Sequence, residues 1–358
     1  MPDLGPPEKP SGKLDGVQVF RGIAAMLVVF HHAASHIDGF PSVKDGLQRF
    51  FVTRFFNTDL GMIGVDLFFV VSGFIMVYTT FGRDTTPVQF LKKRALRIYP
   101  LYWFFSLVVI ALHATPYLGR IGAGIATVVT SFTLYPVFWF NLPLLRPALL
   151  PQGWTLTYEI LFYLVFAATM RLRPWVQLTL IAVGFAGANA IASFVPGGTS
   201  PEVALFRDCI LLEFPFGMLL ARLLCDRTLR LSHTASCALL AAGALLLAPY
   251  LLHLAGPRVL ILGMPAFVLI AAVVLRRDAA TLRLPRWLVA LGDASYSIYI
   301  THVLVLELHQ VGYIRIRFLR EIPCDVTYVL LVVATALVGG LSYVCVERPL
   351  LRLCRRLI

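Results

Sequence analysis

The chain is poor in charge, and its charge is unevenly divided between the two signs. Only 14% of its 358 residues are Asp, Glu, Lys or Arg, against about 25% in an ordinary soluble domain. It has 19 acidic and 31 basic residues, so the formal net charge is +12 at pH 7, and 58% of the chain is hydrophobic. A composition this apolar excludes an ordinary soluble domain and predicts an integral membrane protein.

Several signatures of nucleotide and metal chemistry are also absent. The sequence has no glycine-lysine loop of the kind that cradles ATP phosphates, and no dinucleotide glycine fingerprint in a suitable context. Its six cysteines form no C-x-x-C pair and have no Cys/His ligand spacing. We therefore expect no ATP hydrolysis, no nicotinamide chemistry, no metal site, no prosthetic group and no disulfide framework.

Long apolar runs predict an all-α bundle of about ten transmembrane helices, because a helix needs about 20 apolar residues to cross hydrocarbon. The expected spans are 17–35, 61–81, 99–115, 153–170, 175–194, 205–224, 234–254, 259–275, 287–306 and 326–346. Segment 121–150 is also apolar, but Pro136, Pro143 and Pro147 interrupt its second half. We expect this segment to stay on the outer side as a re-entrant or interfacial element.

Loop charges predict the orientation, because Lys and Arg accumulate in cytoplasmic loops. Basic clusters lie within 92–97, 171–173, 222–230, 276–286 and 352–356. All five are cytoplasmic if 121–150 does not cross, so both termini are expected there. We expect a polar tail over 1–16, one membrane domain over 17–350 and a basic tail over 351–358. The basic excess then reflects membrane topology, and we expect no nucleic-acid partner.

Arg21 and His32 lie inside the first apolar run, where ionisable side chains are costly and usually have a function. They are about three helical turns apart, so both point the same way from one helix, about 16 Å apart along its axis. The neighbouring His31 points about 100° away from that face. The orientation puts Arg21 near the cytoplasmic surface and His32 in the outer half of the bilayer.

Three further ionisable residues, Asp66, Glu159 and His302, are expected at the depth of His32 on other spans. An imidazole beside a carboxylate suits general-base chemistry, in which the ring takes a proton from a hydroxyl and the carboxylate orients the ring. Proton-coupled transporters use the same groups. Asp66 could equally cap a helix start, and His302 could be an ordinary interfacial residue.

The cytoplasmic segment 90–100 carries a dense positive charge. Arg94 and Arg97 share a helix face and can clamp a phosphate, while Lys92 and Lys93 raise the local potential. This pattern suits a nucleotide-bearing donor or anionic lipid headgroups, although topology alone also explains it.

Taken together, these motifs resemble the acyltransferase-3 family of membrane acyltransferases. The segments that carry the resemblance are QVFRGIAA at 18–25 with His32, GVDLFFVVSGF at 64–74, RALR at 94–97, WTLTYE at 154–159, SYSIYITH at 295–302 and VERP at 346–349. Gln18 and the Thr-Tyr-Glu form of the fourth motif are most similar to the branch of exopolysaccharide O-acetyltransferases.

The resemblance implies an enzyme of the bacterial inner membrane that moves an acetyl group from cytoplasmic acetyl-CoA to hydroxyls of a saccharide. It implies that Arg21 and His32 are the essential pair and that Glu159 is their acidic partner. Donor binding is implied for Arg94 and Arg97, with Lys93 beside them. The candidate supporting residues are Asp66, Ser72, His302 and Glu347, and a helix-end salt bridge is an equally good account of Glu347.

Several alternatives remain open at this point. The histidine could act as a base or carry the acetyl group transiently. The acceptor could be an exopolysaccharide, a lipopolysaccharide antigen, an antibiotic or another hydroxyl compound, and the acyl group could be succinyl or longer. A proton-coupled exporter or flippase for a lipid-linked saccharide is the alternative function, against which the lack of inverted repeats argues. The oligomeric state is undetermined.

Overall fold

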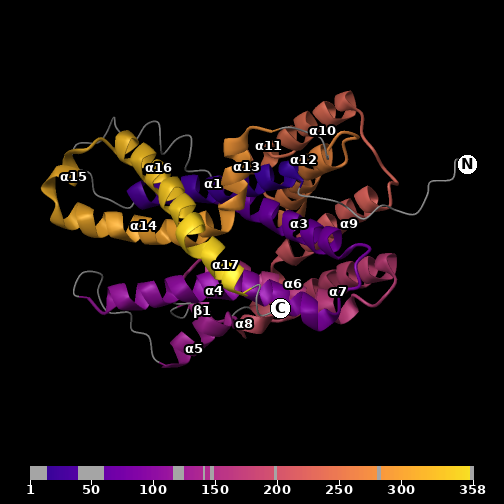
Figure 1. Ribbon diagram of the computed structural model, residues 1–358, viewed down its shortest axis with the longest axis horizontal. Helices are drawn as coiled ribbons and strands as arrows, with labels where there is room; N and C mark the ends of the chain where they lie inside the picture. Colours follow the sequence, from indigo (N-terminus) through magenta and orange to yellow (C-terminus); the bar gives the residue numbers. More distant parts are fainter. Residues whose placement is uncertain are drawn as a thin grey trace, which may run out of the picture. The chain divides into compact units, whose positions relative to one another are not determined.

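The computed structural model describes residues 14–38, 60–115, 125–139, 142–145, 149–196, 200–279 and 284–354. In chain order the elements are α1 (Asp15–Asp38), α3 (Leu60–Thr80), α4 (Pro87–His113), α5 (Ile125–Thr133), β1 (Phe138–Trp139), β2 (Leu142–Leu145), α6 (Gly153–Thr169), α7 (Pro174–Phe194), α8 (Pro201–Arg207), η1 (Cys209–Leu212), α9 (Glu213–Cys225), α10 (His233–Leu245), α11 (Ala248–Leu251), η2 (Val259–Gly263), α12 (Met264–Val274), α13 (Arg286–Asp293), α14 (Ser295–Arg315), α15 (Arg317–Glu321), α16 (Cys324–Ser342), η3 (Tyr343–Glu347) and α17 (Arg348–Cys354) (Figure 1). The helical class predicted from the sequence is confirmed.

Six helices are long and apolar enough to cross a membrane, or seven if α13 and α14, which meet at a 70° bend, form one span. The expected count of about ten is therefore not confirmed within the described ranges. The remaining expected spans coincide with shorter helices. Helix α6 has 17 residues, η2 and α12 together cover Val259–Val274, and the region expected at 205–224 is divided among α8, η1 and α9.

Within segment 121–150, the described residues include the short helix α5 and the antiparallel pair of β1 and β2. Helix α5 has only 9 residues, too few to cross hydrocarbon. Two side chains of α4 donate hydrogen bonds to the last carbonyls of α5. Trp103 Nε1 donates to Phe132 O at 2.9 Å, and the Tyr99 hydroxyl donates to Thr133 O at 3.3 Å. The placement of this segment relative to the membrane stays a prediction, as do the two tails, whose residues 1–13 and 355–358 lie outside the described ranges.

The chain forms two compact units, each assembled from segments far apart in the sequence. Unit 1 comprises 1–21, 66–94 and 158–290, and unit 2 comprises 22–65, 95–157 and 291–358. Residues of the sequence motifs occur in both units.

Glycines let the central helices of unit 1 approach closely. A Cβ on Gly73 of α3 would overlap the Phe214 carbonyl of α9, and a Cβ on Gly217 would overlap the Val70 carbonyl. Small residues permit such backbone contact between membrane helices. Around this crossing Phe162 stacks on Phe214 at 4.1 Å between ring centroids. The glycine of the Ser-Gly-Phe motif therefore fixes α3 against α9.

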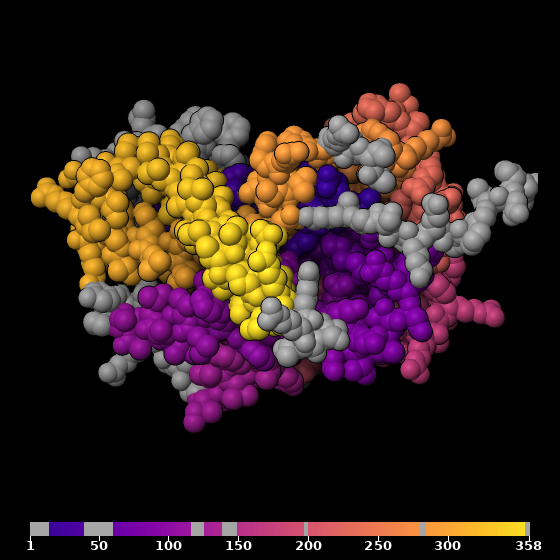
Figure 2. All heavy atoms as spheres, in the orientation of Figure 1, coloured from indigo at the N-terminus to yellow at the C-terminus, as the bar shows by residue number. Residues whose placement is uncertain are grey.

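The core of unit 2 joins α1, α14 and α16. Its buried members are Ala33, Ala34, Ile37, Leu306, Tyr328 and Leu331. Helices α14 and α16 pack along one another, seen as the orange and yellow ribbons in Figure 1 and as adjoining surfaces in Figure 2. Gly339 allows the contact, because a Cβ there would meet Ile298. This packing holds the second half of α1 beside α14.

Candidate functional site

Arg21 and His32 lie on one continuous helix, α1, as predicted. The guanidinium of Arg21 donates to Gln18 Oε1, one turn earlier, at 3.2 Å. His32 Nδ1 lies 2.9 Å from the Val28 carbonyl oxygen. A carbonyl can only accept, so Nδ1 carries the proton and Nε2 keeps its lone pair. The imidazole is therefore held in the tautomer that can take a proton at Nε2.

His302 of α14 is brought against His32 in unit 2. Their ring centroids are 4.9 Å apart and the rings are tilted by 53°. His302 is fully buried, and its Nδ1 lies 2.6 Å from the Tyr299 carbonyl oxygen. Its Nε2 has no hydrogen-bond partner among the residues that the structure describes. The structure thus brings these two histidines together, and His302 is buried inside unit 2.

The position of α1 in unit 2 is set by glycines of α3. A Cβ on Gly64 would lie 2.5 Å from the Ala24 carbonyl oxygen, and one on Gly61 would lie 3.0 Å from the His31 ring. His31 therefore packs against α3. Its ring is edge-on to that of His32, with 5.1 Å between the centroids.

Glu159 of α6 is the centre of a polar group in unit 1. Its Oε1 accepts a hydrogen bond from Ser72 Oγ of α3 at 2.9 Å and another from the Tyr163 hydroxyl, one turn further along α6. Arg94 of α4 lies over the Tyr163 ring, 5.9 Å from its centroid, and donates to Thr79 Oγ1 at 3.0 Å. Two hydroxyl donors on one oxygen suit an ionised carboxylate. The structure thus brings together three predicted site residues, Ser72, Arg94 and Glu159.

Tyr163 was not among the predicted site residues. The signal was present in the sequence, because residues four apart on a helix are neighbours on its surface. The side chain is buried, and it lies between Glu159 and Arg94. It is therefore the residue through which the carboxylate and the guanidinium are connected.

Arg97 occupies a separate polar group in unit 2. It pairs with Glu347 of η3, whose other oxygen accepts a hydrogen bond from Ser297 Oγ at 2.6 Å. The Arg97 guanidinium also lies over the Tyr296 ring, 5.4 Å from its centroid. Glu347 is only 1% exposed, so its charge is compensated inside the protein. Glu347 therefore forms a salt bridge, although it lies within the continuous helix Cys324–Cys354 and not at a helix end. The adjacent Lys93, by contrast, is solvent-exposed.

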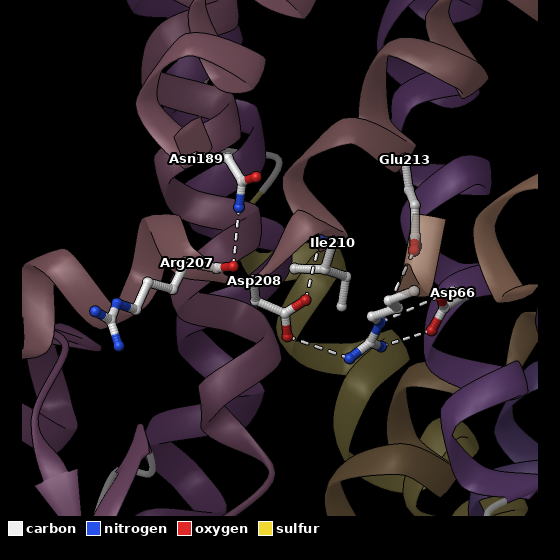
Figure 3. Close-up of polar contacts among 7 residues, drawn as sticks. Asp66, Asn189, Arg207, Asp208, Ile210 and Glu213 are labelled. Carbon is white, nitrogen blue, oxygen red and sulfur yellow. Dashed lines mark hydrogen bonds and ion pairs between the residues drawn. The ribbon is translucent and has the colours of Figure 1, made fainter. Parts of the chain in front are cut away.

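Asp66 lies in the middle of a helix, and the alternative that it caps a helix start is wrong because α3 begins at Leu60. It forms a bidentate pair with Arg258, at 2.6 Å from Nη2 to Oδ2 and 3.3 Å from Nε to Oδ1. Asp208 is 3.2 Å from the same guanidinium and Glu213 is 4.0 Å from it. In Figure 3 these three carboxylates converge from α3, α9 and the turn before η1.

Arg258 precedes η2 and was not predicted as a site residue. Burial opposes its charged form, but Asp66, Asp208 and Glu213 outweigh that effect and raise the pKa of the guanidinium. Asp66 and Glu213 are both fully buried, and the Arg258 guanidinium is the cation that compensates their negative charge. The cluster therefore joins three parts of unit 1 that are distant in the sequence.

Comparison with known proteins identifies the chain's relatives. Residues 14–345 match the family model of the acyltransferase domain. The chain belongs to this family. It is 32% identical to the exopolysaccharide production protein ExoZ of Rhizobium meliloti over 82% of this chain and 90% of that protein. It is also 28% identical to the acyltransferase MdmB of Streptomyces mycarofaciens, over 84% of this chain and 83% of that protein.

The acyltransferase-3 resemblance read from the motifs is thus confirmed, and the protein is an acyltransferase enzyme. Its apolar helices and this family membership make it a multi-pass membrane protein. No solved structure matches the chain.

Proposed function

We propose that this protein is a membrane O-acetyltransferase that moves an acetyl group from cytoplasmic acetyl-CoA to a hydroxyl of a saccharide. The acceptor would belong to an exopolysaccharide or another cell-surface glycan. Support for this acceptor comes from the similarity to ExoZ, which is named as an exopolysaccharide production protein. We further propose about ten spans in a bacterial inner membrane, with both termini cytoplasmic, because that orientation puts the basic loops inside.

The observation that carries the chemistry is the anchored tautomer of His32. In the proposed reaction Nε2 of His32 takes the proton of the acceptor hydroxyl, while the oxygen of that hydroxyl attacks the thioester carbonyl carbon. The carbon–sulfur bond then breaks, and the CoA sulfur leaves with the proton that the imidazolium returns. The net products are the acetyl ester and free CoA, and the histidine is regenerated. General-base catalysis of this kind contributes about 10²–10⁴-fold to rate.

The remaining site residues are assigned by position. Arg21 lies about 16 Å from His32 along α1, toward its N-terminal end, and is proposed to contact the donor near its thioester arm. Glu159 is proposed as the acidic residue, ordered by Ser72 and Tyr163. Arg94, Arg97 and Lys93 are proposed to contribute to donor binding through their positive charge.

The test is a comparison of surface polysaccharide from a strain lacking the gene with that from the same strain expressing the protein. Mass spectrometry should show one acetyl increment per modified sugar only when the protein is present. Isotope-labelled acetyl-CoA supplied to membranes should place its label in the same ester. A succinyl increment would correct the acyl group, and an identical polysaccharide in both strains would refute the saccharide acceptor.

A further inference from the structure

A cavity of about 600 Å³ lies in unit 1 where several helices begin or end, and the function proposed above does not use it. Its walls come from the end of α3 and the turn after it, the starts of α4 and α7, the end of α6, and α9. The volume falls within the range of about 300–1,000 Å³ that is usual for small-molecule sites. Two of the expected cytoplasmic clusters, 171–173 and 222–230, contribute to it, so the orientation proposed above makes it cytoplasmic.

The lining is rich in arginine. Arg83, Arg171 and Arg222 line the cavity, and Asp84 is the acidic residue among them. Arg83 and Arg171 are exposed, and neither forms an ion pair with a residue in the described ranges. A guanidinium binds phosphate through paired, charge-assisted hydrogen bonds. Two arginines are therefore available to an anionic ligand.

Arg222 is held in place by the protein itself. It makes two hydrogen bonds to Asp226, at 2.6 and 2.8 Å, and its guanidinium lies over the Phe81 ring at 5.1 Å. Its Nε is buried and has no hydrogen-bond partner among the described residues. Arg222 thus adds a fixed positive group to the wall, although Asp226 offsets part of its charge.

Two long helices begin at the cavity wall. Helix α4, of 27 residues, begins at Pro87, and α7, of 21 residues, begins at Pro174. The first-turn N–H groups and the helix dipole make such an end favourable for anions. The N-cap residue of α7, Arg173, makes no side-chain capping hydrogen bond. At the start of α4, the Gln89 N–H is already bonded to Thr86 Oγ1, so the end of α7 is the one that adds to the arginines, and the combined potential favours a phosphate-bearing molecule.

The inner wall of the cavity is continuous with the polar group around Glu159. Phe166 lines the cavity and packs on Phe90 at 5.1 Å, and Arg94 lies over that same Phe90 ring at 5.4 Å. Beyond Arg94 come Tyr163 and then Glu159, all within unit 1. A ligand with its charged end in the cavity could therefore extend an uncharged arm toward Arg94.

We infer that this cavity binds the phosphates of the donor's nucleotide, with the acyl-bearing arm directed past Arg94. The ligand class is an acyl thioester of a phosphorylated nucleotide carrier, and the inference rests on the proposed use of acetyl-CoA. Arg83 and Arg171 bind the phosphates directly. Arg94 then contacts the arm. Its guanidinium is held in position by the Thr79 hydroxyl and by the Phe90 and Tyr163 rings.

The experiment uses the full-length protein in phosphatidylcholine nanodiscs and the double variant Arg83→Gln with Arg171→Gln. Calorimetry with CoA and with 3′,5′-ADP should show affinity reduced by about tenfold or more, because charge-assisted hydrogen bonds are lost. The matched control is Arg277→Gln, an exposed arginine of unit 1 that is not part of the cavity lining. It should bind both probes as the unaltered protein does.

A kinetic arm separates this inference from the proposed function. The double variant should raise KM for acetyl-CoA but leave transfer from acetyl-pantetheine, which lacks the nucleotide, unchanged. Unchanged CoA affinity in the double variant would overturn the inference while leaving the proposed function standing. In a second preparation whose nanodiscs also contain phosphatidylglycerol, loss of binding of this lipid by the double variant with unchanged CoA affinity would overturn the inference in favour of a lipid-headgroup site. Weakened CoA binding without acetylation of any saccharide would support the cavity and refute the acceptor.

Discussion

The rings of His32 and His302 lie 4.9 Å apart, and each is anchored through Nδ1 to a main-chain carbonyl of its own helix. Because carbonyls only accept hydrogen bonds, Nδ1 is the donating nitrogen of each ring in these contacts. Two imidazoles fixed in this tautomer within apolar helices cost stability and suggest proton transfer. This pair supports the proposal that α1 carries the reaction.

The hydroxyls that bind Glu159 should affect the rate. Ser72→Ala and Tyr163→Phe each remove one hydrogen bond to the same carboxylate oxygen, and each should lower kcat about five- to tenfold. The double variant should lose less than the product of the two effects, because the residues share one partner. Ser106→Ala is the control, since Ser106 is also buried and, among the described residues, bonds to the Tyr102 carbonyl of its own helix and not to Glu159. If the kcat loss in the double variant equals the product of the two single losses, the two hydroxyls act independently.

The two arginines of α4 should behave differently when replaced. Arg94→Gln should raise KM for acetyl-CoA more than it lowers thermal stability, because Arg94, which donates to the Thr79 hydroxyl, is proposed to contact the donor. Arg97→Gln leaves the buried Glu347 carboxylate without its cation and should lower the free energy of unfolding by about 3 kcal/mol. Steady-state kinetics and thermal unfolding of both variants would separate these roles. Equal effects of the two substitutions on stability would contradict the assignment.

The Asp66–Arg258 pair should be structural. Arg258→Gln strands two fully buried carboxylates, Asp66 and Glu213, and should destabilise the protein by about 3–5 kcal/mol. Adding Asp66→Asn to that variant should restore part of the stability, because it removes one of the uncompensated charges. Thermal unfolding in detergent would measure both. No recovery in the double variant would mean that the pair is not the main interaction of Arg258.

The glycine at the crossing of α3 and α9 should tolerate no side chain. Gly73→Val would place methyl groups where the Phe214 backbone lies, so little folded protein is expected. Gly184→Val in α7 is the control, because a Cβ there meets nothing within 4 Å. The yield of monodisperse protein from size-exclusion chromatography measures the difference. Equal yields would show that the close helix contact is not required.

Much of the fold could be predicted because hydrophobic run length and charged loops report directly on membrane helices. The bounds of α1, α3 and α7 agree with the expected spans within a few residues. The region 205–224 was expected to be one helix, but Asp208 leaves the helical conformation there. Its backbone is extended, and its side chain accepts from the Ile210 N–H. Such a local break is not visible in hydrophobicity alone.

The site could be predicted only where a motif marked it. Arg21, His32 and Glu159 stand out because they are ionisable residues inside apolar runs. Arg258 lies between such runs, so its partnership with Asp66 required the three-dimensional structure. The cavity is formed by residues from three separate parts of the chain, and no single stretch of sequence carries its signal.

The most direct test of the central claim is acetyl transfer by His32→Ala in nanodiscs, with labelled acetyl-CoA at saturating concentration and a saccharide acceptor. We predict that the rate falls at least about 100-fold while CoA affinity and thermal stability are retained. The adjacent variant His31→Ala, whose ring packs against Gly61, should keep most of the activity. A His32→Ala enzyme that transfers acetyl within about twofold of the unaltered rate would contradict the account, since less than 0.5 kcal/mol of barrier would then depend on that ring.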